Sequence, residues 1–524
     1  MTTHPTSDQA EQSTARGGAD DTPTGAADSQ ADTRTEADGA AVATLIRRLT
    51  ESFGERSVLT DEAQRRTYEC DGLAAYSVVP AVVVLTTNAE QVREVVASCH
   101  ELGVPFVARG SGTGLSGGAL PVADGALIVL SQMRDILHVD PLAQRAVVEP
   151  GVINLDVTAA AKPHGYYYAP DPSSQQICSI GGNVAENSGG AHCLKYGFTT
   201  NHVLAVDMIA PDGEPATLGT VAPDAPGYDL LGTVVGSEGT LGVVTEVTVR
   251  LTRLPEKVTT LLAGFGSVDD AGTATSAIIG AGVVPAAIEM MDRLAIEAAE
   301  KAVQCDYPKG AGAVLVIELD GAASEVDSEV DDVVRHCEEA GAFEVRHAQD
   351  DTERALIWRG RKSAFAAVGR ISPDYIVQDG VIPRTALSEV LHRIDELAAE
   401  AGIRVANVFH AGDGNLHPLV LFDAGKEGET ERAEGVSGDI LRLCLEKGGS
   451  ITGEHGVGAD KAPYMAEMFG PDDLDTMQLL RCAFDPRHLS NPGKVFPTPR
   501  LCGERPGRRQ GAHPLQEAGL AEVF

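Results

Sequence analysis

A glycine-rich stretch between two predicted strands limits the folds open to this chain. It reads FVARGSGTGLSGGALP at residues 106–121, and its segment at 112–117 matches the G-x-G-x-x-G pattern of dinucleotide-binding loops. Such a loop follows a strand and opens a helix, whose N-terminal amides bind the pyrophosphate. Here Pro121 and an apolar run at 126–130 follow instead, which predicts a second strand. A Rossmann-type NAD site therefore lacks the helix that it needs.

The residues before this loop predict a strand, a helix and another strand. The first strand is expected at 81–85 and the second at 104–108. Between them, apolar residues recur at helical spacing up to the stop at Gly103: Val92, Val95, Val96, Cys99 and Leu102. A strand–helix–strand unit of this kind predicts a locally parallel sheet.

The glycine loop can bind a diphosphate without a helix, because glycines let successive backbone N–H groups converge on one point. The alternative is a tight turn that binds nothing. Two more segments rich in Gly, Ser and Asn follow, at 169–197 and 227–251. Three such segments in one domain predict a long ligand bound in an extended form.

Four motifs carry a resemblance to a known family: RGSGTGLSGG, CSIGGNVAENSGG, HCLKYG and GSEGTLGVVTEVTVRL. They resemble the FAD-binding domain of the vanillyl-alcohol-oxidase/p-cresol-methylhydroxylase flavoproteins. The most similar branch contains D-lactate dehydrogenases, D-2-hydroxyglutarate dehydrogenases and the D subunit of bacterial glycolate oxidase. The resemblance extends from about residue 45 to the C-terminus, and it implies an α+β fold with a two-subdomain FAD-binding domain and an α+β cap domain built on an antiparallel sheet.

The expected domain boundaries combine this resemblance with composition. Residues 1–40 are polar and acidic and are expected to form a disordered tail, since they can bury little apolar surface. The expected units are listed in chain order: a FAD-binding domain at 41–255, a cap domain at 256–465, a segment at 466–500 that returns to the FAD domain, and a tail at 501–524.

The resemblance implies that FAD binds to the glycine-rich segments. Relatives with covalent FAD often have a histidine in the first glycine loop, and this loop has none, so non-covalent FAD is expected. The predicted FAD-binding residues are Arg109, Gly110, Ser111, Gly112, Thr113, Gly114, Ser116, Gly117, Asp171, Cys178, Gly181, Gly182, Asn183, Ala185, Asn187, Glu238, Gly239, Val243 and Asn491.

The cap region contains the stretch VANVFHAGDGNLHPLVLF, which predicts two strands joined by a glycine-rich turn. His410 and His417 flank this turn, so the turn brings the two imidazoles together. A histidine pair in a hairpin is often only structural, but Glu454 in GGSITGEHGVG offers a third ligand. Two histidines and one carboxylate suit a catalytic divalent metal with open coordination positions.

The resemblance assigns the same roles. The motifs HAGDGNLH and GEHG match those whose two histidines and glutamate bind a divalent metal, with zinc or manganese expected here. The histidine after the glutamate, His455, corresponds to the proposed base. A metal that binds the C2 hydroxyl and the carboxylate of a 2-hydroxyacid lowers the hydroxyl pKa and orients C2–H toward flavin N5, while a neutral histidine accepts the proton.

A substrate carboxylate also requires a cation. The spacing Trp358-x-x-Arg361 resembles a family segment, so Arg361 is predicted to bind the carboxylate, with Arg359 as the competing choice. Relatives that act on dicarboxylates have a lysine at the position of Val377. Its absence favours glycolate first and D-lactate second over D-2-hydroxyglutarate.

The predicted function is thus FAD- and metal-dependent oxidation of a small (R)-2-hydroxyacid. The resemblance implies an FAD-containing sibling subunit and an iron–sulfur subunit as electron acceptor, and the nine cysteines include no C-x-x-C pair that would hold a cluster on this chain. The alternatives are a stand-alone D-lactate or D-2-hydroxyglutarate dehydrogenase and a non-catalytic flavin-binding subunit.

Charge and hydropathy exclude other classes of function. The net charge of −35 leaves no basic surface for nucleic acid. No apolar run reaches the 18 residues that a membrane span needs, and the polar start of the chain is unlike a secretory signal. A cytoplasmic protein is expected, which could be peripheral to the membrane through its partner subunits.

Overall fold

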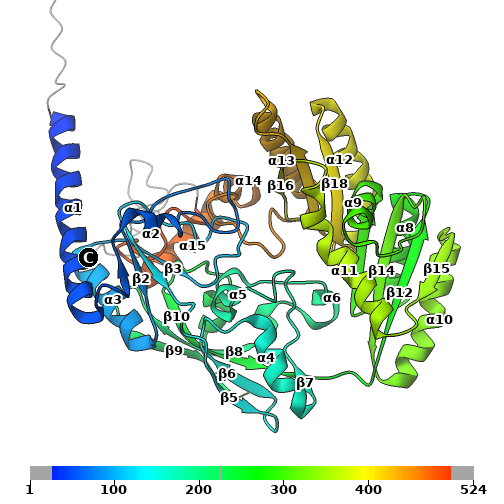
Figure 1. Cartoon of the computed structure of the whole chain (residues 1–524), viewed down its shortest axis with the longest axis horizontal. Helices are drawn as coiled ribbons and strands as arrows, with labels where there is room; N and C mark the ends of the chain where they lie inside the picture. The colour runs from blue at the N-terminus through cyan, green and yellow to red at the C-terminus, as the bar shows by residue number, and fades with distance from the viewer. Residues whose placement is uncertain (1–25, 223–226, 497–524) are drawn as a thin grey trace, which may run out of the picture.

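The computed structural model describes residues 26–222 and 227–496. They form two α+β domains that stand side by side in Figure 1, with the N-terminal domain in blue to green and the cap domain in green to brown. Helices and mainly antiparallel sheets occur in both, which confirms the predicted fold class. None of the described helices is long and apolar enough to cross a bilayer.

The first sheet of the N-terminal domain contains the predicted strand–helix–strand unit. Its order is β1-β2-β4-β3, and β4 pairs in parallel with both β2 and β3. The strands are β1 (Val58–Leu59), β2 (Val82–Leu85), β3 (Phe106–Arg109) and β4 (Ala126–Val129). The crossover helix α3 (Ala89–Leu102) ends at Gly103, whose φ of 74° is the left-handed conformation that glycine adopts readily.

The parallel pairing is as predicted, but β4 lies between the two strands that α3 connects. The glycine loop therefore leaves the sheet at the end of β3 and returns to its centre. Residues 110–125 are all described, and none of them is helical. This confirms that the loop leads into a strand and that the NAD-binding fingerprint lacks its helix.

The second sheet of this domain is antiparallel, in the order β5-β6-β10-β8-β9. Its strands are β5 (Ile136–Asp140), β6 (Arg145–Val148), β8 (Val203–Ile209), β9 (Pro215–Gly219) and β10 (Val243–Arg250). The short strands β7 (Tyr166–Tyr167) and β11 (Thr252–Arg253) form a separate pair. Other helices of this domain are α2 (Glu62–Arg66), which lies between β1 and β2 in the chain, and α4 (Asn154–Ala161), α5 (Ile180–Glu186), α6 (Cys193–Tyr196) and α7 (Leu230–Val234).

Helix α1 (Ala26–Phe53) precedes the first sheet and packs against α3 through Leu45 and Leu49. Residues 26–40, which we expected to belong to a disordered tail, form the first part of this helix. The stretch AADSQADTRTEADGA contains five Ala, the residue with the highest intrinsic helix propensity. Residues 1–25 of the expected tail and 501–524 of the other tail lie outside the described residues.

The cap domain is built on one antiparallel sheet in the order β15-β12-β14-β13-β18-β19-β16, with β17 paired to β19. Its strands are β12 (Lys257–Phe265), β13 (Ala287–Asp292), β14 (Ala313–Gly321), β15 (Glu344–His347), β16 (Asp374–Val377), β17 (Gly380–Val381), β18 (Arg404–His410) and β19 (Asn415–Phe422).

Helices cover both faces of this sheet, because alternate residues of each strand are apolar on opposite sides. Leu261 and Phe265 of β12 belong to one buried cluster, whereas Leu262 belongs to the other. The first cluster lies under α8 (Val268–Gly280), α10 (Ala323–Glu339), α12 (Leu387–Ala401) and α13 (Glu429–Glu446). The second lies under α9 (Arg293–Val303) and α11 (Asp351–Val368), on the side of the N-terminal domain.

The HCLKYG motif is part of the contact between the two domains. Tyr196 donates a hydrogen bond to Asp320 at 2.7 Å, and Lys195 forms an ion pair with the same carboxylate at 2.7 Å. His192 Nε2 lies 3.3 Å from Glu318 Oε1. Strand β14 of the cap thus binds three side chains of one short segment of the N-terminal domain.

After the cap, the chain passes through α14 (Met465–Met468) and α15 (Pro471–Phe484) and returns to the N-terminal domain, as Figure 1 shows in orange. Ser490 forms a parallel bridge with Phe106 of β3. Phe106 N–H donates to Leu489 O, and Asn491 N–H donates to Phe106 O, both at 2.8 Å. The edge of the first sheet is therefore completed by residues almost four hundred positions later in the chain.

Candidate active site

A cavity of about 1060 Å³ lies between the two domains. The N-terminal domain contributes the glycine loop and the segments around α5 and before β10, and the cap contributes residues of α11, β16 and the GEHG segment. Most residues predicted to bind FAD line it: Arg109, Gly110, Ser111, Gly112, Thr113, Gly114, Cys178, Gly181, Gly182, Asn183, Ala185, Glu238, Gly239 and Val243. The structure therefore brings three segments that are distant in the sequence around one cavity.

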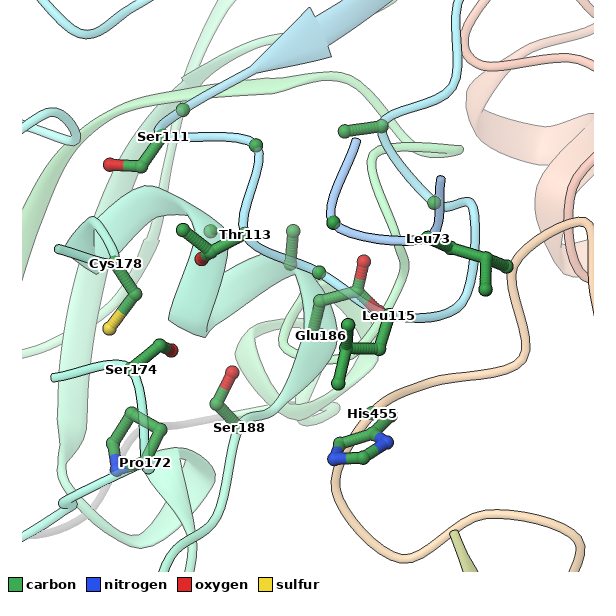
Figure 2. A pocket seen from close by; sticks show the side chains of 18 of the residues that line it. Leu73, Ser111, Thr113, Leu115, Pro172, Ser174, Cys178, Glu186, Ser188 and His455 are labelled. Atoms are coloured by element: carbon green, nitrogen blue, oxygen red, sulfur yellow. The ribbon is translucent and has the colours of Figure 1, made fainter. Parts of the chain in front are cut away.

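Figure 2 shows Ser111, Thr113 and Leu115 of the glycine loop facing Ser174, Cys178 and Ser188 across the cavity. The loop is bound to the second segment, because Ser111 N–H donates to Ser179 Oγ at 3.3 Å. Gly112 has a φ of +69°, and an added Cβ would collide with the Arg109 guanidinium. Glycines and the Ser111 and Thr113 hydroxyls are among the residues that line this wall, and such groups can offer donors to a diphosphate.

Arg109, which was predicted to bind the cofactor, is held by backbone groups. Its Nη1 donates to Cys70 O at 2.6 Å and to Tyr68 O at 3.3 Å. Burial lowers its pKa, although the nearby Asp71 carboxylate opposes the shift. Arg109 thus lines the cavity and also connects the glycine loop to the segment that follows α2.

The other predicted FAD residues lie outside the lining: Ser116, Gly117, Asp171, Asn187 and Asn491. Asn491 Nδ2 donates to Gly118 O at 2.8 Å and to Glu238 O at 2.6 Å, so it joins two lining segments from behind. Asn187 ends α5 in the left-handed conformation and accepts a hydrogen bond from Thr200 N–H. These side chains shape the cavity without facing it.

Ser116 and Gly117 contact the segment after GEHG. The Ser116 carbonyl accepts hydrogen bonds from Ala459 N–H and Asp460 N–H, and Ala459 packs against Gly117. Asp171 pairs with His192 at 2.8 Å and lines a second, small pocket. The glycine-rich pattern located these positions, but the sequence could not show which of them lie one layer behind the cavity.

The predicted histidine hairpin is present in the cap. Strands β18 and β19 pair antiparallel with His410 opposite Asn415 and His417 opposite Val408, so the two histidines are diagonal neighbours. Their ring centroids lie 5.1 Å apart. Both side chains are buried, as expected for residues at the centre of an eight-stranded sheet.

Glu454 completes the predicted ligand set. His410 Nε2 and His417 Nε2 lie 3.3 Å and 3.0 Å from its Oε1. Burial alone would raise the pKa of Glu454, but the two imidazoles hold it well below its usual value. Its Oε2 is buried and has no hydrogen-bond partner among the described residues. Two imidazole nitrogens and a carboxylate that converge with a spare oxygen fit a divalent metal.

The imidazole of His410 is oriented from behind by Glu289, whose Oε1 lies 2.6 Å from His410 Nδ1. Burial lowers the pKa of His410, but the Glu289 and Glu454 carboxylates outweigh burial and raise it well above its usual value. A carboxylate behind a histidine ligand fixes the ring and makes it a stronger ligand. The sequence offered no signal for Glu289, which comes from β13, more than a hundred residues earlier.

His455 lies at the border between this ligand set and the cavity. It lines the cavity, and in Figure 2 its ring faces the loops of Ser188 and Leu115. The ring stacks on His417 with centroids 5.0 Å apart. Burial lowers the pKa of His455 to about 4, although the Asp379 charge opposes this shift. The imidazole is therefore neutral near pH 7 and can accept a proton.

Arg361 lies behind the site rather than in the cavity lining. It is buried, and its Nη2 lies 2.6 Å from Glu289 Oε2. It faces a small pocket of about 10 Å³ that also includes His410. The next residue, Lys362, lines both this pocket and the large cavity. Binding of a substrate carboxylate by Arg361 stays a prediction, and Lys362 is a cation for which the sequence gave no signal.

Two other positions were singled out in this region of the sequence, and they lie in different surroundings. Arg359, the competing choice, is exposed on α11 and is absent from both pocket linings. Val377, where dicarboxylate-specific relatives have a lysine, lines the cavity. The cavity wall at this point is therefore apolar.

Comparisons with known proteins agree with this geometry. A model of FAD-binding domains matches residues 80–219, and one of the C-terminal domain of FAD-linked oxidases matches residues 254–495. The chain is 54% identical to glycolate oxidase subunit GlcD of Escherichia coli (strain K12) over 83% of this chain and 88% of the relative. It is 33% identical to a D-lactate dehydrogenase of Anaerostipes hadrus over 86% and 97%.

Among solved structures, p-cresol methylhydroxylase is similar, with a TM-score of 0.73 at 16% identity over 87% of this chain and 97% of that one. This likeness confirms the predicted fold of the cofactor-binding domain. The protein is thus an FAD-dependent hydroxyacid oxidoreductase by its domains and its relatives. The chain belongs to the FAD-linked oxidase family.

Proposed function

We propose that this chain oxidises a small (R)-2-hydroxyacid to the 2-oxoacid, with glycolate as the first candidate and D-lactate as the second. A divalent metal, zinc or manganese, would be held by His410, His417 and Glu454. The observation that supports this most is the convergence of three buried ligand groups beside His455 at the edge of the FAD cavity. When bound, FAD supplies the hydride acceptor and the metal supplies a Lewis acid for the hydroxyl.

The residues of the chain perform the remaining steps. The neutral imidazole of His455 accepts the proton of the C2 hydroxyl at a ring nitrogen, and its stacking on His417 keeps it beside the metal ligands. Lys362 and Arg361 provide positive charge for the substrate carboxylate, Lys362 from the cavity wall and Arg361 from behind His410. The buried ligand set excludes bulk water, which strengthens these interactions.

The small size of the substrate is supported by Val377. An apolar side chain at this point of the wall offers no partner for a second carboxylate, so D-2-hydroxyglutarate is disfavoured. The name of the E. coli relative favours glycolate, and that of the A. hadrus relative makes D-lactate the alternative. Since the E. coli relative is named as a subunit, we propose that this chain also works with an FAD-containing sibling and an iron–sulfur subunit that receives the electrons.

Anaerobic flavin bleaching tests this proposal. The purified protein is mixed with glycolate, D-lactate or D-2-hydroxyglutarate, before and after metal removal by a chelator. We expect fast bleaching by glycolate, and a rate at least about a hundredfold lower in the metal-free protein, restored by zinc or manganese. Full-rate bleaching without metal would contradict the metal site. A metal-loaded protein that none of the three acids bleaches would contradict the substrate class.

A further inference from the structure

The segment that contains Glu454 and His455 has no regular secondary structure. Residues 452–457 are all described, and none is in a helix or strand. Their backbone N–H groups therefore need partners elsewhere, because an unpaired buried N–H costs free energy. Two of these residues must also be placed accurately, one to reach the hairpin histidines and the other to face the cavity.

Asp379 supplies partners for the first half of this segment. It is fully buried between β16 and β17 of the cap. Its Oδ2 accepts hydrogen bonds from Thr452 Oγ1 at 2.6 Å, from Gly453 N–H at 3.0 Å and from His455 N–H at 2.9 Å. The N–H of Glu454 lies 3.2 Å from the same oxygen. One carboxylate thus binds the backbone of both functional residues.

The negative charge of Asp379 is compensated by Lys461, which follows this loop by a few residues. The fully buried Lys461 places its Nζ 3.3 Å from Asp379 Oδ2 and 3.2 Å from Asp379 O. Although burial favours the neutral acid, Lys461 and the nearby histidines hold the pKa of Asp379 well below its usual value. A buried anion that accepts several backbone N–H groups is a rigid support.

Glu238 of the N-terminal domain supplies partners for the second half. Its two oxygens accept hydrogen bonds from Val457 N–H at 2.7 Å and Gly458 N–H at 2.6 Å. Glu238 was predicted to bind FAD, and it does line the cavity, but its carboxylate binds this loop instead. Between the two supports, Gly456 has a φ of +88°, and an added Cβ would collide with Glu186.

We propose that Asp379 and Glu238 are positioning residues, one from each domain, that together hold the 452–458 loop so that Glu454 meets the hairpin histidines and His455 faces the FAD cavity. The inference rests on the proposed metal site. Since Glu238 also lines the FAD cavity, the loop is the physical connection between the cofactor site and the metal site. Asp379, which binds the residues adjacent to the metal, has the larger effect on metal affinity.

The test compares Asp379→Asn and Thr452→Val with Asp292→Asn. Asp292 is a matched control, since it also accepts backbone N–H groups in the cap, from Ala295 and Asn407, but does not touch the loop. Zn²⁺ is titrated into each FAD-loaded, metal-free protein against a competing chelator. Flavin absorbance before titration reports whether FAD and the fold are retained.

We expect Asp379→Asn to weaken Zn²⁺ binding about 10- to 100-fold and to slow flavin reduction, with excess Zn²⁺ restoring part of the rate. Thr452→Val, which removes the hydrogen bond donated to Asp379 and the one accepted from Gly456 N–H, should show a smaller loss. It keeps the test decisive if the first variant does not fold. Asp292→Asn should bind Zn²⁺ like the unaltered protein.

Three outcomes would contradict these statements. If the unaltered protein binds no Zn²⁺, the proposed metal site is wrong. If it binds Zn²⁺ and both Asp379→Asn and Thr452→Val bind it equally well, the positioning role is wrong while the metal site stands. A loss in Asp292→Asn as large as that in Asp379→Asn would also contradict the proposal, because the effect would then come from general destabilisation.

Discussion

The FAD cavity wall and the histidine hairpin show two ways of building a site. The wall includes many glycines and other small residues, with Gly112 and Gly182 among them. The hairpin site consists of charged and ionisable side chains, His410, His417 and Glu454, each buried. A wall made of backbone tolerates side-chain changes but not added bulk, whereas a site made of side chains is lost with any one of them. Substitutions should therefore affect one site while leaving the other unchanged.

The largest effect is expected at His455, where the two regions meet. Replacement of His455 by Ala removes the proton acceptor and should slow flavin reduction by about two to four orders of magnitude. Bound FAD and Zn²⁺ affinity should remain, since His455 is not one of the three proposed metal ligands. Stopped-flow bleaching with glycolate measures the rate, and His138→Ala, an exposed histidine on β5, is the control. An unchanged rate would remove His455 as the base.

A smaller effect is expected at Gly112, where FAD affinity should change. Gly112→Ala places a methyl group against the Arg109 guanidinium, so this part of the cavity lining must shift, and FAD binding should weaken about tenfold. Zn²⁺ affinity should not change. Quenching of FAD fluorescence by the apoprotein gives the dissociation constant. Gly54→Ala has a similar strain, with φ +78° and open space around it, so it should leave FAD affinity intact.

The smallest effect on either site is expected at the contact between the domains, where the change is in stability. Burial alone would lower the pKa of His192, but the Asp171 and Glu318 carboxylates raise it to about 10 from 6.5. A raised pKa means that the charged imidazole stabilises the fold fully below about pH 6.5 and loses this effect as the pH rises through about 10. His192→Gln should therefore cost about 2 kcal/mol of unfolding free energy near pH 7 and less near pH 10.5.

Urea unfolding at both pH values measures this difference. His392→Gln is the control, since His392 pairs with Asp269 at the surface and should contribute little. An equal cost of His192→Gln at the two pH values would contradict the assignment of a charged His192 near pH 7.

The sequence predicted the three candidate metal ligands better than the residues around them. The glycine-rich turn of HAGDGNLH predicted that His410 and His417 come together, and GEHG supplied Glu454. Glu289, Asp379 and Lys362 were missed, because each reaches the site through strand order or helix packing between distant segments. Position along the chain carries no signal for such contacts.

The glycine loop shows the same limit in the other domain. Its composition predicted a phosphate-binding wall, and Pro121 correctly excluded a helix after it. The insertion of β4 between β2 and β3 could not be predicted, since the order of strands in a sheet depends on pairings between segments that are separate in the sequence. Nor could the pattern separate Gly112, which lines the cavity, from Asn491, which supports it from behind.

The pairing of Phe106 with residues 489–491 has a consequence for biosynthesis. During translation the edge of β3 emerges early, but its partner leaves the ribosome only after the entire cap has been made. An unpaired strand edge can associate with other chains in the meantime. The first domain therefore completes its sheet last, and a chain that stops before Leu489 leaves that edge open even when both domains are otherwise made.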